Sequence, residues 1–148
     1  RNSELYKKLV IDEQKVRFIG GGAFNTIDPY LINIQASLIN KEDMQYVKDE
    51  IIKAIEKVKT SGVNQKELEE TKSYIKYNYA MSIDNPDAIA NSLAHFIYLT
   101  GDPESLNRFY SLYEEVTEED LVNAAKKYYT DNKLTVATIS PDEEGGVK

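Results

Sequence analysis

The sequence predicts an α+β fold in two layers, with an antiparallel or mixed sheet packed on helices. Two segments near the amino terminus, 16–19 and 30–38, have the composition and alternation of strands. From Asn40 onward apolar residues recur at helical spacing, and a last β-branched segment, 134–139, precedes a proline. Strands grouped before a run of helices favour α+β over alternating parallel units.

The chain is expected to begin with a helix over Ser3–Gln14. Leu5 and Leu9 share one helical face there, and Ser3 is suited to cap the first turn. This helix would bury its leucines against the first strand.

Three consecutive glycines, Gly20–Gly22, separate the two strand segments, and Asp28–Pro29 favours a turn between them. A phosphate-binding loop would need a helix after the glycines, whereas a second strand follows here. We therefore interpret the glycines as a bulge or bend in a hairpin strand. Ile32, Ile34 and Ala36 share one face of the second strand, opposite Leu31, Asn33 and Gln35, so we expect both isoleucines to be buried.

Capping residues divide the helical part of the chain. Asn64, with Glu67 as a capping-box partner, Asn85 before Pro86, Asp102 before Pro103, and Thr117 with Asp120 are each expected to start a helix. The helix before Asn64 carries one apolar stripe that ends at Gly62 (Val47, Ile51, Ile55 and Val58). Gly101 should end the helix that starts at Asn85. Leu134–Ile139 should form a strand that stops at Pro141.

Composition narrows the classes of function. With 148 residues, the chain is long enough for one cored domain. A net charge of −7 and a pI near 4.8 argue against nucleic-acid binding. No apolar run is long enough to cross a bilayer, so we expect no membrane contact, and no cysteine is present for a disulfide or thiolate site.

The residues offer no self-sufficient active site. His95 is the only histidine, so no two-histidine zinc motif exists, and we expect it to be a packed residue rather than part of a Ser-His-Asp arrangement. Acidic clusters at 67–70 and 114–120 are interpreted as solvated helix starts, with metal binding as the alternative. An aromatic series is interpreted mainly as core, with a peptide groove as the alternative (Phe109, Tyr110, Tyr113, Tyr128 and Tyr129).

Four stretches together resemble the inactive half of an M16 metallopeptidase, the pitrilysin and insulinase family. They are SELYKKLVIDEQKVRFIGG, DPYLINIQASL, VNQKELEETKSYIKYNYAMSIDNPDAIANSLAHFIYLTGD and YEEVTEEDLVNAAKKYYTDNKLTVATISP. The last is the most specific, because it resembles the closing helix and terminal strand of the family. The resemblance runs from Ser3 to Pro141.

The resemblance implies a part of the C-terminal inactive domain over 1–141, without that domain's first strand and helix, followed by a flexible tail over 142–148. Zinc would sit in an N-terminal half, on an H-x-x-E-H motif that this sequence lacks, so neither a metal ligand nor a cofactor is expected in this segment. This half would form the wall of a chamber in which peptides are cut. Substrate contact would come from the sheet faces of 16–24 and 30–38, and an exposed edge could accept a peptide strand.

The same resemblance points to one pair of positions. The inactive half of the family supplies an Arg-x6-Tyr pair that helps to hold substrate. Leu9 matches the leucine before that arginine, but Val10 and Arg17 occupy the two positions of the pair. Direct help with catalysis is therefore not expected, and no catalytic residue is assigned.

The expected partners are an N-terminal M16 domain or a companion active subunit, together with a peptide substrate. Whether the chain also forms an oligomer is left open. The alternative function is a catalytically dead M16-like subunit that acts as an assembly scaffold or partner of an active one. A third interpretation sets the resemblance aside and keeps a helical interaction domain beside a small sheet. No signal peptide is present, and the compartment stays open, with a periplasmic or other extracytoplasmic site as one option for a bacterial member.

Overall fold

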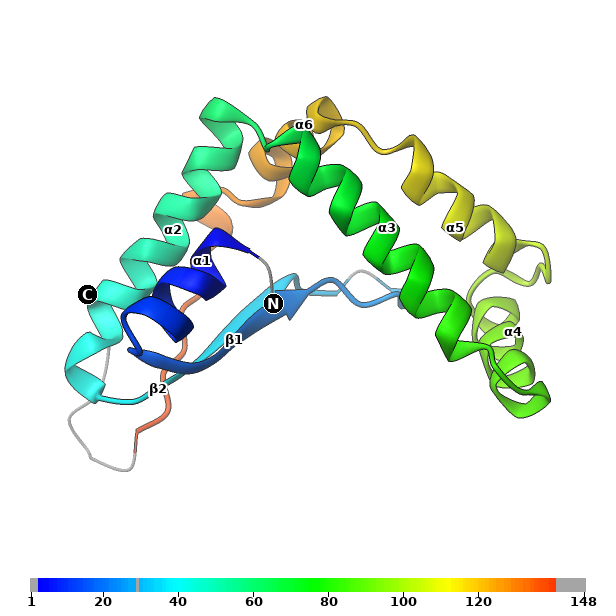
Figure 1. Cartoon of the computed structure of the whole chain (residues 1–148), viewed down its shortest axis with the longest axis horizontal. Helices are drawn as coiled ribbons and strands as arrows, with labels where there is room; N and C mark the ends of the chain where they lie inside the picture. Colours follow the sequence, from blue (N-terminus) through cyan, green and yellow to red (C-terminus); the bar gives the residue numbers. More distant parts are fainter. Residues whose placement is uncertain (1–2, 29, 141–148) are drawn as a thin grey trace. The chain divides into compact units, whose positions relative to one another are not determined.

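The computed structural model describes residues 3–28 and 30–140. These residues form two compact units, each with its own packing. Unit 1 contains 3–24, 30–61 and 123–140, and unit 2 contains 25–28 and 62–122. Figure 1 shows the course of the chain through both units.

Unit 1 begins with a short helix, α1 (Glu4–Tyr6), which widens into a π-helical segment, η1 (Lys7–Asp12). The Ser3 hydroxyl accepts a hydrogen bond from the Tyr6 backbone N–H at 3.2 Å, which confirms the expected cap. Leu9 lies in η1 and is completely buried. The helix predicted for this region is therefore present, although its second part is wound more loosely than an α-helix.

A two-stranded antiparallel sheet follows, made of β1 (Val16–Gly22) and β2 (Asn33–Leu38). Gly20, Gly21 and Gly22 lie within the ladder opposite Gln35, Ile34 and Asn33, so they belong to a regular hairpin strand. The bulge expected at the glycines is instead at Arg17, the extra residue between Val16 and Phe18. The second strand begins at Asn33, three residues later than expected at Tyr30, and Pro29 lies outside the described residues.

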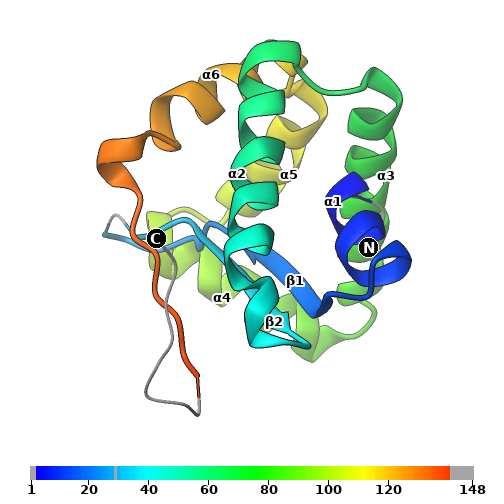
Figure 2. The same ribbon diagram turned by 90° about the vertical axis from the view of Figure 1, so that its left-hand side faces the viewer.

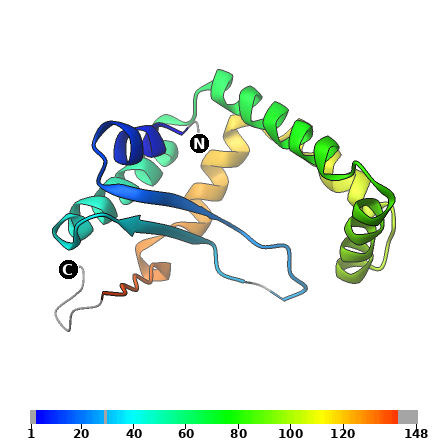
Figure 3. The same cartoon turned by 60° about the horizontal axis from the view of Figure 1, so that its bottom comes forward.

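The inner face of the hairpin packs under α1 and α2 (Met44–Ser61), as Figures 2 and 3 show. Leu9, Val16 and Val47 are its fully buried centre, and half-buried apolar residues surround them (Leu5, Val10, Ile19, Ala36, Leu38, Tyr46 and Ile51). This helix-on-sheet arrangement is the α+β layering that the sequence predicts.

The helices cover only one end of the hairpin. Ala36 and Leu38 join the core, whereas Ile34 on the same face is 40% exposed and Ile32 is 38% exposed. The expected burial of both isoleucines is therefore wrong. The alternation assigned the face of Ile34 correctly, but none of the described helices of the unit buries that part of the sheet.

Unit 2 is built from α3 (Gln65–Ser82), α4 (Pro86–Thr100) and α5 (Ser105–Glu115). The Asn64 carboxamide accepts from the Lys66 N–H at 2.8 Å, and that of Asn85 accepts from the Ala88 N–H at 2.9 Å. Gly101 ends α4 with φ +74°, a left-handed conformation that costs glycine little.

The last helix, α6 (Glu118–Tyr128), spans the boundary between the units and starts with the expected capping box. The Asp120 carboxylate accepts from the Thr117 N–H at 2.9 Å, and the Thr117 hydroxyl accepts from the Asp120 N–H at 3.2 Å. At Asp102 the carboxylate accepts from the Glu104 N–H, but α5 begins at Ser105, two residues later than the expected start at Pro103, so Glu104 occupies the cap position.

The strand expected over Leu134–Ile139 does not form within the described residues. This segment pairs with neither β1 nor β2, and Leu134, Val136 and Ile139 are exposed. A β-type sequence becomes a strand only when it pairs with another strand, and no described strand pairs with this segment. Pro141 and the tail over 142–148 lie outside the described residues. None of the described helices has the length and apolarity needed to cross a membrane.

Candidate functional site

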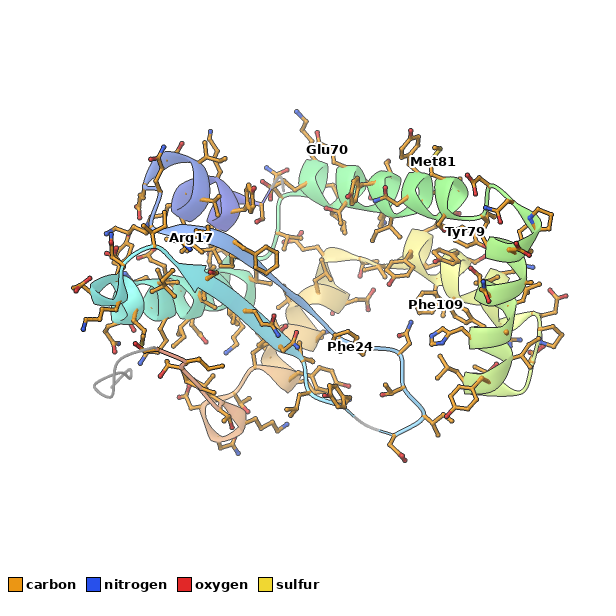
Figure 4. The ribbon with its side chains drawn as sticks, turned by 90° about the horizontal axis from the view of Figure 1, so that it is seen from below. Arg17, Phe24, Glu70, Tyr79, Met81 and Phe109 are labelled. Carbon is orange, nitrogen blue, oxygen red and sulfur yellow. The ribbon has the colours of Figure 1, made fainter. Side chains whose placement is uncertain are left out.

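Val10 and Arg17, the two positions singled out by sequence, have different environments. Val10 is half-buried in η1 and packs against the Leu9–Val16–Val47 core. Arg17 occupies the bulge of β1 and is exposed, without an ion pair to another described residue (Figure 4). Val10 therefore has a packing role, and Arg17 is accessible to solvent.

His95 lies on α4, where its ring meets the ring of Phe96 edge-on at 5.7 Å. The residue is exposed, so the prediction of a packed histidine with a satisfied nitrogen is wrong. It lies on the solvent side of the helix, one position before the buried Phe96. Among the described residues, no group of three histidine, cysteine, aspartate or glutamate side chains is arranged to hold a metal ion.

Side chains of the two acidic clusters form ion pairs and a helix cap. Glu69 pairs with Lys72 at 3.1 Å, and Glu114 pairs with Lys76, whose hydrogen bond lowers the pKa of the Glu114 carboxyl. The hydrogen bonds from Thr117 likewise lower the pKa of Asp120. Glu114 lies in the last turn of α5, so the expectation that the whole cluster marks a helix start is wrong for that residue.

Part of the aromatic series forms the packing of unit 2. Tyr79 of α3 stacks on Tyr110 of α5 with ring centroids 3.6 Å apart, and Phe109 contacts Phe96 of α4 at 5.1 Å and Tyr113 at 5.2 Å. Figure 4 labels Tyr79 and Phe109 in this cluster. Burial raises the pKa of Tyr110. The core interpretation is confirmed for these rings, whereas Tyr128 is exposed at the end of α6.

A cleft lies on the outer face of the hairpin, away from α1 and α2. It has a volume of about 330 Å³ and is lined by Gly20–Gly22 with Phe18, Ala23, Phe24, Asn33 and Gln35. We call it the glycine groove. It falls within the strand segments expected to contact substrate, although no cleft was predicted there. Aromatic residues on both sides of a glycine run were the available signal.

The glycine groove has the chemistry of a binding site and not of a reaction centre. The side chains that the described residues contribute to it are two aromatic rings, two carboxamides and the methyl group of Ala23, and none of them is a nucleophile, an acid or a base. The described residues therefore provide a surface that could hold a ligand.

Comparison with known proteins gives two related results, while no family model matches the chain. The sequence is 25% identical over 130 residues to the zinc protease PqqE of Helicobacter pylori, covering 88% of this chain and 26% of that protein. The chain thus spans about a quarter of the length of the curated relative it matches.

The fold matches the crystal structure of a protease from Helicobacter pylori with a TM-score of 0.77. The match covers 89% of this chain and 32% of the protease, at 20% sequence identity. The chain is therefore related in sequence to a zinc protease and has an α+β fold found in a protease, which confirms the predicted relationship to peptidases at this general level.

Proposed function

We propose that this chain is a non-catalytic part of a zinc-dependent peptidase of the M16 family and forms part of the wall of a peptide-degrading chamber. The observation that carries the proposal is the agreement of sequence and fold with proteases over nearly nine-tenths of the chain. The order of motifs from Ser3 to Pro141, which resembles the inactive half of that family, supports the same assignment.

The residue inventory supports a non-catalytic role. A zinc peptidase activates water on a metal that histidine and carboxylate side chains hold. This sequence has one histidine, His95, and no H-x-x-E-H motif. The zinc and its ligands would belong to a separate N-terminal domain or companion subunit, and the present chain would enclose and orient the peptide.

The test uses the complete encoded polypeptide that contains this chain, together with any subunit that co-purifies with it. We expect bound zinc by atomic absorption and cleavage of a quenched fluorescent peptide. A chelator should abolish cleavage and added zinc should restore it. A complete protein that holds no zinc and cuts no peptide, alone or with its companions, would refute the assignment.

A second candidate is a catalytically dead M16-like subunit that acts as a scaffold or as the partner of an active subunit. It is favoured by Val10 and Arg17, which replace both members of the Arg-x6-Tyr pair. A stable homo-oligomer that holds no zinc and cuts no peptide would support this candidate. Zinc and cleavage in the same polypeptide or in a co-purifying companion chain would support the first.

A further inference from the structure

We propose that Tyr79 and Tyr110 form an oxidative modification site, at which a one-electron oxidant joins the two rings into a dityrosine cross-link between α3 and α5. The inference is independent of the proposed function, because both side chains and their contact lie within unit 2. The contact needs no residue from outside this chain.

Tyrosine is the side chain of this protein that gives up single electrons most readily. The sequence has eleven tyrosines but no cysteine and no tryptophan, the other two side chains that one-electron oxidants attack first. Its two methionines, Met44 and Met81, react differently, because their oxidation adds an oxygen atom. One-electron oxidation of this chain is therefore directed to tyrosine.

One pair of tyrosines is arranged for coupling. The rings of Tyr79 and Tyr110 have centroids 3.6 Å apart, and their planes are inclined by 19°. Because a ring carbon lies only one bond length from its centroid, the carbons ortho to the two hydroxyl groups come close to van der Waals contact, whatever the rotation of each ring in its plane. Among the described residues, the other contact between tyrosine rings is that of Tyr110 with Tyr113, whose centroids are 6.3 Å apart.

The surroundings of the pair hold the rings together and still admit water. Phe109 meets the Tyr110 ring edge-on at 5.4 Å, which restricts its movement away from Tyr79. Burial raises the pKa of Tyr110, so its phenol is protonated at neutral pH and loses the proton together with the electron. Both tyrosines are only half-buried, so a small oxidant can reach the rings and water can accept the protons.

The reaction balances with an oxidant of the peroxide class. Each phenol loses one electron and one proton, which leaves two neutral phenoxyl radicals. A carbon–carbon bond then forms between one ortho carbon (Cε) of each ring, and the hydrogen atom on each of these carbons moves to the phenol oxygen and restores the hydroxyl group. Two electrons and two protons leave in total. They convert hydrogen peroxide into two water molecules, whereas persulfate becomes two sulfate ions and the protons pass to the buffer.

The cross-link would stabilise unit 2. It joins α3 to α5 and closes the chain from Tyr79 to Tyr110 into a loop that contains the whole of α4. A covalent link across such a loop stabilises a protein mainly by restricting its unfolded state. In a chain without cysteine, dityrosine would have the stabilising role that a disulfide has in other proteins.

The experiment oxidises the 148-residue chain at high dilution with tris(bipyridine)ruthenium(II), persulfate and a pulse of visible light. The monomer is then isolated by size-exclusion chromatography. Trypsin releases Tyr79 and Tyr110 on separate peptides, 77–108 and 109–126. We expect mass spectrometry to find these peptides joined with the loss of two hydrogen atoms and to locate the bond at the two tyrosines. The melting temperature of the cross-linked monomer should be about 5–10 °C higher than that of the untreated chain.

Removal of single hydroxyl groups provides matched variants. Tyr79→Phe and Tyr110→Phe keep the ring and its packing but have no phenol to oxidise, so each should lose both the cross-link and the rise in melting temperature. Tyr77→Phe and Tyr113→Phe remove tyrosines from the same two peptides and should keep both. Oxidation of the chain unfolded in urea should show no preference for this pair.

A cross-link between the two peptides that survives in Tyr110→Phe would overturn the inference. A monomer whose links are spread over other tyrosines, or one that forms no internal link, would overturn it as well. A specific link between Tyr79 and Tyr110 that leaves the melting temperature unchanged would refute the stabilising role. These results are independent of zinc content and peptide cleavage, so they leave the peptidase assignment to its own test.

Discussion

Gly21 lies where β1 and β2 come so close together that a side chain at this position would not fit. A Cβ atom at this position would lie 2.2 Å from the backbone oxygen of Asn33 and 2.9 Å from Cα of Ile34. Both are backbone atoms of β2 and cannot rotate away. The close approach of the strands at this point therefore depends on glycine, whereas the neighbouring Gly22 faces open space.

We predict that Gly21→Ala lowers the free energy of unfolding by about 1–3 kcal/mol, the usual cost of overpacking. The matched control is Gly22→Ala, which should be neutral or stabilising by up to about 1 kcal/mol because it only restricts the unfolded chain. Urea denaturation followed by circular dichroism measures both. Equal effects of the two substitutions would show that the strands do not approach closely at Gly21.

Glu50 of α2 is a charged residue at the edge of the unit 1 core, with its side chain only 11% exposed. It accepts hydrogen bonds from Lys53, at 2.8 Å, and from Lys8 of η1. These bonds lower the pKa of the carboxyl below its ordinary value of 4.5. Ionised Glu50 therefore stabilises the folded state above that value, and the contribution is lost as the pH falls through the lowered folded-state pKa.

We predict that Glu50→Gln flattens the loss of stability below pH 4.5, because the titrating partner of Lys8 and Lys53 is gone. At pH 7 the variant should be less stable than the wild type, and the difference should shrink towards pH 3. Melting temperatures across this pH range test the point. Glu42→Gln, at an exposed acid in the turn before α2, is the control and should lower the melting temperature at pH 7 less than Glu50→Gln does.

At the scale of elements, unit 2 depends on the contact of α3 and α5 through the Tyr79–Tyr110 stack. The Lys76–Glu114 ion pair and a hydrogen bond from Lys72 to the Glu114 carbonyl at 3.2 Å join the same two helices. The polar bonds are exposed and contribute little. The stacked rings therefore stabilise the contact between these helices more than the two polar bonds do.

We predict that Tyr110→Ala lowers the free energy of unfolding by more than about 1 kcal/mol, since an aromatic pair adds about that much beyond its buried area. Tyr110→Phe keeps the ring and should be nearly neutral. Tyr77→Ala, at a tyrosine of α3 that is 63% exposed, is the control and should have little effect. Similar losses in Tyr110→Ala and Tyr77→Ala, measured by urea denaturation, would contradict the role of the stack.

Elements whose signals are local were predictable from sequence. Ser3, Asn64, Asn85 and Thr117 cap helices in the structure because a cap depends on residues within one turn. The segment 134–139 was not predictable, because a strand needs a neighbour that local sequence does not specify. The same reason applies to Ile34, whose face was right but whose cover is a matter of tertiary packing.

The glycine groove and the exposure of His95 were likewise not predictable, because both depend on tertiary packing. The run Gly20–Gly22 was correctly assigned to a hairpin, yet the cleft depends on where Phe18 and Phe24 place their rings. His95 lies in an apolar sequence on α4 but on the solvent side, because helix rotation and not composition decides exposure. The positions of Val10 and Arg17 followed from the family resemblance, and their burial from the structure alone.

For the whole molecule, charge is distributed unevenly along the chain. Lys66, Lys72, Lys76 and Arg108 are the only basic residues between 62 and 122, a range that contains about half of the acidic residues. The segment 62–122, with 12 acidic and 4 basic side chains, therefore carries a net charge of −8, and the rest of the chain carries a net charge of +1. An acidic surface attracts divalent cations non-specifically and weakly, which differs from a coordination site with three or more converging ligands.

We predict that metal removal does not change the thermal stability of this chain. The sequence has one histidine and no cysteine, and the described residues contain no converging group of metal ligands. A chain treated with EDTA and dialysed should therefore have the same melting temperature as the untreated chain, and equimolar zinc should not raise it. Because a ligand that binds only the folded state must stabilise it, tight zinc binding would raise the melting temperature by several degrees. Magnesium at the same concentration controls for general charge screening, and a rise with zinc alone would refute the proposal that the zinc lies outside this chain.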